Sequence, residues 1–147
     1  MRHPAVEILF LAGAIAGCID LAAATTFSAL RRILPKRLLQ AIASALIGSK
    51  AFERRWAAAV GLGIHFAIAF TVATIYVSAS RYLPVLVAYP VASGLLYGVG
   101  VHLVMTFIVL PLTSLKRPFS MVFFVVQLVI HAVCVGLPIA LVTRRFS

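Results

Sequence analysis

The stretch Gly13-Ala14-Ile15-Ala16-Gly17-Cys18-Ile19-Asp20 places a carboxylate inside an apolar run. The run extends from Ala5 to Leu30, and its 26 residues are enough to cross a hydrocarbon core of ~30 Å with some tilt. A charged side chain near the middle of a bilayer is costly and usually faces a partner inside the helix bundle. We therefore expect a membrane-spanning helix whose Asp20 side chain is turned towards polar groups of other spans.

The overall composition is that of a membrane protein. Of 147 residues, 63% are hydrophobic and 11% are charged, and the mean hydropathy is +1.13; about 25% of the residues of a soluble domain are charged. The net charge of +10 comes without a basic stripe interleaved with aromatic residues, so we expect no nucleic-acid partner. Cys18 and Cys134 both lie in apolar runs, which indicates no disulfide framework.

The first apolar run also has features of a bacterial lipoprotein signal, with Ile15-Ala16-Gly17-Cys18 as the cleavage sequence. A mature lipoprotein usually continues with a polar tether, whereas this chain stays apolar from Cys18 to Leu30. The run is also longer than the roughly 7–15 apolar residues of a secretory signal. We expect it to remain in the protein as the first span.

Three further apolar runs predict three more spans. We expect spans at about 5–30, 57–79, 90–111 and 121–143, which form a single integral membrane domain over 1–147. The fold class expected is all-α, a transmembrane four-helix bundle. Pro90 suits the first turn of the third span, and Pro138 after Gly136 predicts a kink in the fourth.

A short helix is expected between the first two spans, over about 37–50, since this segment is too short to cross a membrane. Its apolar face consists of Leu38, Ile42, Ala45 and Leu46, and its polar face of Arg37, Gln40 and Ser44. The pattern predicts an amphipathic helix in the interface with its polar face towards lipid headgroups. A re-entrant segment is the alternative.

Glycines recur at helical spacing in the predicted spans, where they let helices approach closely in lipid. The expected helix-packing residues are Gly13, Gly17, Gly61, Gly94 and Gly98. The first and third spans each carry two glycines four apart followed by a polar residue, and the second and fourth each carry a histidine near the middle. A faint two-plus-two internal repeat is therefore an open hypothesis.

Each predicted span carries one ionisable side chain near its middle: Asp20, His65, His102 and His131, with Gln127 one turn before His131. The count starts from the basic residue that flanks each span on one side of the membrane, which is Arg31, Arg55, Lys116 or Arg117. The four ionisable side chains lie between 10 and 14 residues from these basic residues. At ~1.5 Å per residue this is a depth of roughly 15–21 Å. We therefore expect one intramembrane polar layer.

Three interpretations of this layer are open. The groups bond to one another, to Gln127, Thr25 and Thr106 and to backbone carbonyls, which fixes the helix register. Alternatively, they form a proton relay or an ion-binding site, because histidine titrates near neutrality. A metal or haem site is the third, but single histidines without H-x-x-x-H or E-x-x-H pairs lead us to expect no metal and no cofactor. We find no catalytic motif and expect no enzyme.

The distribution of charge sets the expected orientation. One side holds four cations, Arg2, Arg81, Arg144 and Arg145, and the other holds nine: Arg31, Arg32, Lys36, Arg37, Lys50, Arg54, Arg55, Lys116 and Arg117. By the positive-inside rule, the side with nine is cytoplasmic, and both termini are periplasmic in a bacterial inner membrane. We expect the cations from Arg31 to Arg55 to meet anionic lipid headgroups.

Four groups of residues together resemble a widespread family of small uncharacterised four-span bacterial inner-membrane proteins. They are Gln40-Ala41-Ile42-Ala43-Ser44-Ala45-Leu46-Ile47-Gly48 with Ala51-Phe52, Gly63-Ile64-His65-Phe66, Met105 through Pro111-Leu112, and His131 with Val135-Gly136-Leu137-Pro138-Ile139-Ala140. The resemblance covers most of the chain and implies that Asp20, His65 and His131 belong to a shared pattern. Members often have another residue where this chain has His102, and asparagine where it has Thr106. The resemblance implies no biochemical activity.

Two functions follow as expectations. The first is a non-enzymatic membrane protein that acts through helix contacts, as a homo-oligomer or as an accessory to a larger complex. Any glycine pair that points outwards would be its docking surface. The alternative is a proton- or ion-coupled permeation unit centred on Asp20 and the histidines. A chain this small has little room for a wide aqueous path, so the alternative calls for an oligomer.

Overall fold

The computed structural model describes residues 4–114 and 118–146, and within these ranges it is all-α, which confirms the predicted fold class. Four helical segments are long and apolar enough to cross a membrane: Ala5–Leu30, Ala57–Ser80, Pro90–Leu112 and Met121–Phe146. Their bounds agree with the predicted spans at the start and extend up to three residues further at the end. The protein is therefore a multi-pass membrane protein by length and composition of its helices.

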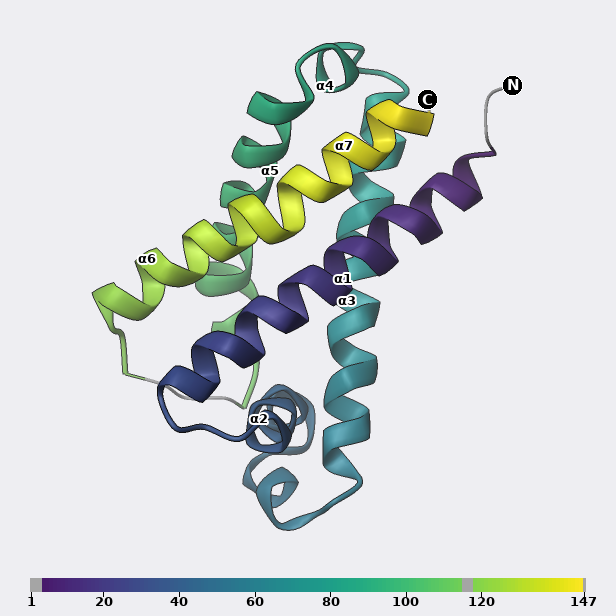
Figure 1. Ribbon diagram of the computed structural model, residues 1–147. Helices are drawn as coiled ribbons and strands as arrows, with labels where there is room; N and C mark the ends of the chain where they lie inside the picture. The colour runs from purple at the N-terminus through teal and green to yellow at the C-terminus, as the bar shows by residue number, and fades with distance from the viewer. Residues whose placement is uncertain (1–3, 115–117, 147) are drawn as a thin grey trace.

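The helices follow in the order α1 (Ala5–Leu30), α2 (Pro35–Ile47), η1 (Ser49–Glu53), α3 (Ala57–Ser80), α4 (Val85–Ala88), α5 (Pro90–Val104), η2 (Met105–Val109), η3 (Leu110–Leu112), α6 (Met121–Ile130), η4 (His131–Gly136) and α7 (Leu137–Phe146). In Figure 1, α1 packs on α3 and also lies beside η4 and α7, while α5 packs on η4 and α7. The start of α1 and the end of α7 lie at one end of the bundle, and α2 lies at the other.

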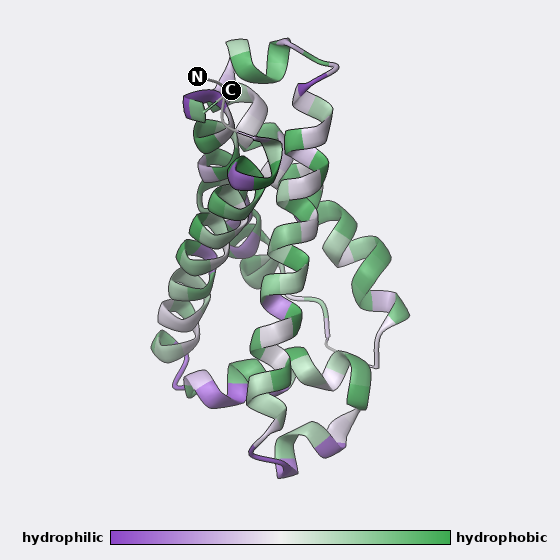
Figure 2. Ribbon diagram, turned by 90° about the vertical axis from the view of Figure 1, so that its right-hand side faces the viewer, coloured by the Kyte–Doolittle hydropathy of each residue, from purple (hydrophilic) through white to green (hydrophobic). Residues whose placement is uncertain are grey.

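Hydropathy differs between the middle of the bundle and its ends. Apolar residues cover the four long helices, and hydrophilic residues gather at the ends of the bundle, most visibly around α2 and η1 (Figure 2). Large apolar side chains such as Leu96, Leu112 and Val122 are more than 70% exposed on the outside of the protein. In a bilayer this surface meets lipid chains, so its exposure carries no penalty.

The core is built largely from small side chains. Its buried members are Ala12, Ala16, Val72, Ala73, Tyr76, Val135, Ile139 and Ala140. Alanines allow backbones to approach closely, which is how helices gain van der Waals contact where lipid is as apolar as the core. Two tyrosine side chains form hydrogen bonds between the elements around this core. Tyr97 Oη donates to the carbonyl of Val72 (2.7 Å), Tyr76 Oη donates to that of Leu86 (3.1 Å), and the two rings pack edge to face.

The glycines singled out in the sequence all lie at contacts between elements of the same chain. An added Cβ at Gly13 would overlap the Phe70 ring, and one at Gly17 would lie 2.8 Å from the Phe66 ring. At Gly61 it would overlap the carbonyl of Leu39 in α2. The glycines at 94 and 98 in α5 meet the backbone of η4 and α7, opposite Gly136. None of the five is therefore available on the outer surface as a docking residue.

Two segments of the spans are π-helical, η2 and η4, and each precedes a proline. A proline inside a helix lacks the N–H for the usual bond, and its ring crowds the carbonyl four residues earlier. Widening the preceding turn relieves this crowding. At Pro138, where the sequence predicted a kink, the structure has the π-helical segment His131–Gly136. The same explanation applies to Met105–Val109 before Pro111, a π-helical segment that was not predicted.

The orientation of α2 differs from the prediction. Gln40 and Ser44, which we placed on the headgroup face, are 2% and 3% exposed, whereas Leu46 is 70% exposed. Gln40 Nε2 donates to the carbonyl of Arg54 (2.9 Å) and Ser44 Oγ to that of Ala41 (2.7 Å). The small and polar face packs on α3 and η1. Gln40 finds a partner there at the end of η1, Ser44 is satisfied within α2 itself, and a leucine at a membrane surface needs no partner.

Candidate polar site within the membrane

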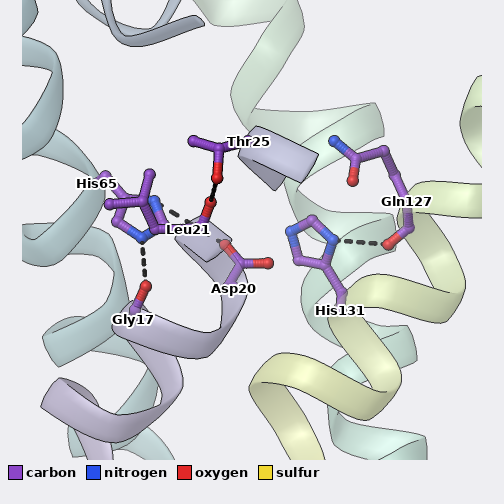
Figure 3. Close-up of polar contacts among 7 residues, drawn as sticks. All are labelled: Gly17, Asp20, Leu21, Thr25, His65, Gln127 and His131. Carbon is purple, nitrogen blue, oxygen red and sulfur yellow. Dashed lines mark hydrogen bonds and ion pairs between the residues drawn. The ribbon is translucent and has the colours of Figure 1, made fainter. Parts of the chain in front are cut away.

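Asp20 of α1 lies between the imidazoles of His65 in α3 and His131 in η4 (Figure 3). Its carboxylate Oδ2 is 3.9 Å from His65 Nδ1, and the two side chains are 16% and 12% exposed. The small residues around Gly17 bring α1 onto α3 at this level, because a larger side chain would overlap the ring of Phe66. The predicted partnership of Asp20 with groups on other spans is therefore present in the structure.

His65 makes a second contact that fixes which of its ring nitrogens carries the hydrogen. Its Nε2 lies 2.9 Å from the backbone oxygen of Gly17. A carbonyl oxygen only accepts, so Nε2 carries the hydrogen and donates it. In the neutral imidazole, Nδ1 then carries a lone pair and no hydrogen, and it faces the Asp20 carboxylate. A favourable contact requires one proton between them, on His65 Nδ1 or on Asp20.

His131 repeats this arrangement on the other side of Asp20. Its Nδ1 donates to the backbone oxygen of Gln127 (2.7 Å), which leaves Nε2 as the acceptor of a neutral ring. In Figure 3 this second nitrogen is on the side of the ring towards Asp20. Asp20 is therefore flanked by two imidazoles, each held by a backbone carbonyl through its other nitrogen.

His102 extends the group to the remaining span. It is 4% exposed, and its ring centroid is 5.1 Å from that of His131 and 4.9 Å from that of Phe124. Its Nε2 lies 3.5 Å from Thr106 Oγ1, one of the partners expected from the sequence. Close approach at Gly98, whose added Cβ would lie 2.5 Å from Ala132 Cα, brings α5 onto η4 just before these rings.

We call Asp20, His65, His131 and His102 the polar row. Asp20 lies 10 residues before the end of α1, His65 lies 8 after the start of α3, His102 lies 10 before Leu112, and His131 lies 10 after Met121. All four ends belong to the α2 end of the bundle. At ~1.5 Å per residue, the row lies at one depth of roughly 12–15 Å, near the middle of a ~30 Å core. It runs across the bundle.

Two other polar groups depart from the expectation. The hydroxyl of Thr25 donates to the carbonyl of Leu21 in its own helix (2.7 Å), so it does not bond to a histidine there. Gln127 contributes its backbone oxygen, while its buried side-chain Oε1 has no hydrogen-bond partner among the described residues. Gln127 therefore supports His131 through the main chain, which no sequence pattern indicates.

Within residues 4–114 and 118–146, no group of three or more His, Cys, Asp or Glu side chains is arranged to hold a metal ion. Cys18 is exposed on the outside of α1 and Cys134 is half-buried. Two hollows in the described part of the chain lie near the start of α1 and the end of α7, one beside Glu7 and one beside Arg144.

The expected headgroup residues form an exposed group at the α2 end. Arg31, Arg32, Lys36, Arg37, Lys50, Arg54 and Arg55 are all exposed. Arg37 Nη1 donates to the carbonyl of Phe52 (3.3 Å). Lys116, Arg117 and Arg2, which entered the charge count, lie outside the described residues.

The chain was compared with protein family models, with curated proteins and with solved structures, and none matches. The resemblance suggested by the sequence therefore stays a prediction.

Proposed function

We propose that the protein is a non-enzymatic, proton-coupled membrane protein in which the polar row binds a proton and passes it between helices. One observation carries this proposal: the Asp20 carboxylate lies between two imidazoles whose donor nitrogens are already bonded to carbonyls. The contact of Asp20 with His65 thus calls for a shared proton, and the second nitrogen of His131 faces Asp20 from the other side. Ionisable groups in the middle of a membrane are costly, and they commonly mark proton or ion pathways.

The π-helical segment that begins at His131 adds support. Such segments are rare and occur frequently at functional sites. Here the widened turn ends at Gly136, and it holds one imidazole of the row next to another span. A small change in this turn would alter the distance between His131 and Asp20, which gives a simple means of coupling helix movement to proton transfer.

The row lies at one depth, so it links helices and does not by itself connect the two aqueous faces. Transport across the membrane therefore calls for a second copy or for movement of the helices. The exposure of Asp20 (16%) and His65 (12%) on the protomer leaves a side from which a neighbouring molecule or water reaches them.

The proposal is tested by infrared difference spectroscopy of the full-length protein in liposomes between pH 6 and pH 9, a range above the ordinary titration of an exposed glutamate. A carboxyl C=O band that grows as pH falls is expected from Asp20, and the variant Asp20→Asn should lack it. Glu53→Gln is the matched control, because Glu53 is an exposed carboxylate outside the spans. A pH-sensitive dye in the same liposomes measures proton flux, which Asp20→Asn should reduce to the level of empty liposomes.

The outcomes separate clearly. If the band is present in the parent protein and persists in Asp20→Asn, the protonated group is not Asp20 and the proposal fails. If Asp20→Asn carries the same flux as the parent, the row is a structural element that sets helix register. Loss of band and flux in Asp20→Asn, with Glu53→Gln unchanged, supports the proposal.

Action through helix contacts is the second candidate function, as a homo-oligomer or an accessory to a larger complex. The observation that favours it is the outer face of α3, where Ala59, Gly63 and Ala67 are exposed at a spacing of four and a Cβ at Gly63 would meet no atom within 4 Å. The variant Gly63→Leu should then lower the oligomeric state in detergent, with Gly100→Leu as control. An unchanged mass would count against this function.

For location, we propose the inner membrane of a bacterium, with both termini periplasmic. The support is the charge distribution: the exposed cations from Arg31 to Arg55 gather at the α2 end, opposite the termini. A C-terminal reporter that is active only in the cytoplasm should give no signal. A strong signal would reverse the orientation.

A further inference from the structure

Arg31, at the end of α1, is held between two helices. Its guanidinium carbon lies 5.8 Å from the centroid of the Phe27 ring in α1 and 5.8 Å from that of Phe123 in α6. The two rings are themselves 6.0 Å apart. A guanidinium against aromatic faces is attracted by the ring quadrupoles and keeps its N–H donors free to bond at its edge. The two rings therefore position Arg31 at the junction of α1 and α6.

The chain reverses direction directly after Arg31 at an unusual backbone position. The N–H of Arg32 donates to the carbonyl of Ala29 (2.9 Å) and that of Ile33 to the carbonyl of Ser28 (2.9 Å), which is the Schellman pattern of a helix end. Arg32 takes a φ of 58°, where glycine is usual. An arginine here costs conformational energy. The turn thus presents two adjacent arginines at the membrane surface.

These arginines have no carboxylate partner in the described part of the chain, where the ion pair found is that of Asp20 with His65. From Arg31 to Arg55 the sequence has seven cations and one acidic residue, Glu53, a net charge of +6. Anions from outside the chain must balance this charge. A bilayer surface supplies them as lipid phosphates.

We propose that an anionic phospholipid binds at the junction of α1 and α6, with its phosphate on Arg31 and Arg32. Apolar side chains beside the arginines favour a lipid over a free phosphate. Leu30 is 79% exposed and Leu34 68% exposed, and Val122 on α6 is 72% exposed. Acyl chains cover these groups while the headgroup meets the guanidinium fork, which binds phosphate through two parallel hydrogen bonds.

The site goes beyond the proposed proton function, since it depends on none of the residues of the polar row. Its place between α1 and α6 has a structural consequence. These helices carry Asp20 and, through η4, His131. A lipid bridging their ends would hold the two helices together from outside the bundle.

The test is native mass spectrometry of the full-length protein in detergent, titrated with phosphatidylglycerol and, separately, with phosphatidylcholine. The parent should bind phosphatidylglycerol more tightly. Arg31→Gln should weaken that binding roughly fivefold, because a charge near a lipid surface and a cation–π contact are both lost. Arg31→Lys keeps the charge and loses the planar fork, and should weaken it about twofold to threefold.

Arg81→Gln is the matched control, since Arg81 is an exposed arginine at the other end of α3. It should change the affinity less than about twofold. Equal losses in Arg31→Gln and Arg81→Gln would show that only net charge matters and would overturn the proposal. Equal binding of the two lipids would also overturn it. So would displacement of the lipid by an equal concentration of glycerol 3-phosphate, which would indicate a site for free phosphate.

Discussion

Gly136 offers the most direct test of how the spans are held together. It lies in η4 against α5, and an added Cβ would overlap the carbonyl oxygen of Gly94 and lie 2.5 Å from Gly98 N and 2.7 Å from Gly98 Cα. All three atoms belong to a helix backbone, which has no rotamer to change. The variant Gly136→Ala therefore forces α5 and η4 apart.

The size of the effect follows from these distances. Ordinary carbon contacts need about 3.5 Å, so the helices must separate by about 1 Å or more, which forfeits about half of the dispersion energy of each contact. Overpacking of this kind costs typically ~1–3 kcal/mol. Alanine recovers up to about 1 kcal/mol through helix propensity. We expect a net loss of about 1–2 kcal/mol, or roughly fivefold to thirtyfold in the folding equilibrium.

The measurement is the free energy of unfolding in mixed micelles titrated with sodium dodecyl sulfate and followed by circular dichroism. Gly63→Ala and Gly100→Ala are matched controls, because a Cβ at either position meets no atom within 4 Å. Both should leave stability unchanged or raise it by up to about 1 kcal/mol. The reasoning is refuted if Gly136→Ala is as stable as the parent, or if the controls lose as much.

Two further substitutions probe hydrogen bonding by the same assay. Tyr97→Phe should lower the free energy of unfolding by about 0.5–1.5 kcal/mol, because it removes the hydrogen bond to the Val72 carbonyl. Tyr82→Phe is the control and should have no effect, because the Tyr82 side chain is 84% exposed. Equal losses in the two variants would contradict the role of the Tyr97 hydrogen bond. Gln127→Leu should leave stability unchanged or raise it by about 1 kcal/mol, since it removes a buried oxygen that lacks a partner in the described structure. A clear loss would mean that this oxygen has a partner under the conditions of the assay.

Much of the candidate site could be predicted by counting along the chain. The rise per residue of a helix is nearly constant, so the distance of Asp20, His65, His102 and His131 from the nearest span end gives their depth directly. Rotation about each helix axis is not contained in such a count. That His65 bonds to the Gly17 carbonyl, and His131 to the Gln127 carbonyl, therefore emerged only from the packed structure.

The roles of the glycines were predicted in part. Their spacing indicates close helix approach, and each lies at such a contact, but whether the partner is in the same chain depends on three-dimensional packing. Gly136 was noted in the sequence only beside Pro138, yet it fits against Gly94 and Gly98. The sequence signal for this contact is Pro138, because a proline crowds the preceding turn and so widens it into η4.

The sequence by itself determined the number of spans, their bounds and the charge at each end, because a bilayer imposes a minimum apolar length and backbone hydrogen bonding leaves only helices for such segments. Tertiary structure alone decided which faces are buried. In α2, the apolar pattern pointed Gln40 and Ser44 outwards, and the structure buries them against α3 and η1. Hydropathy ranks residues against water, whereas at a membrane surface a leucine is already well solvated and a polar group is stabilised by a bonded partner.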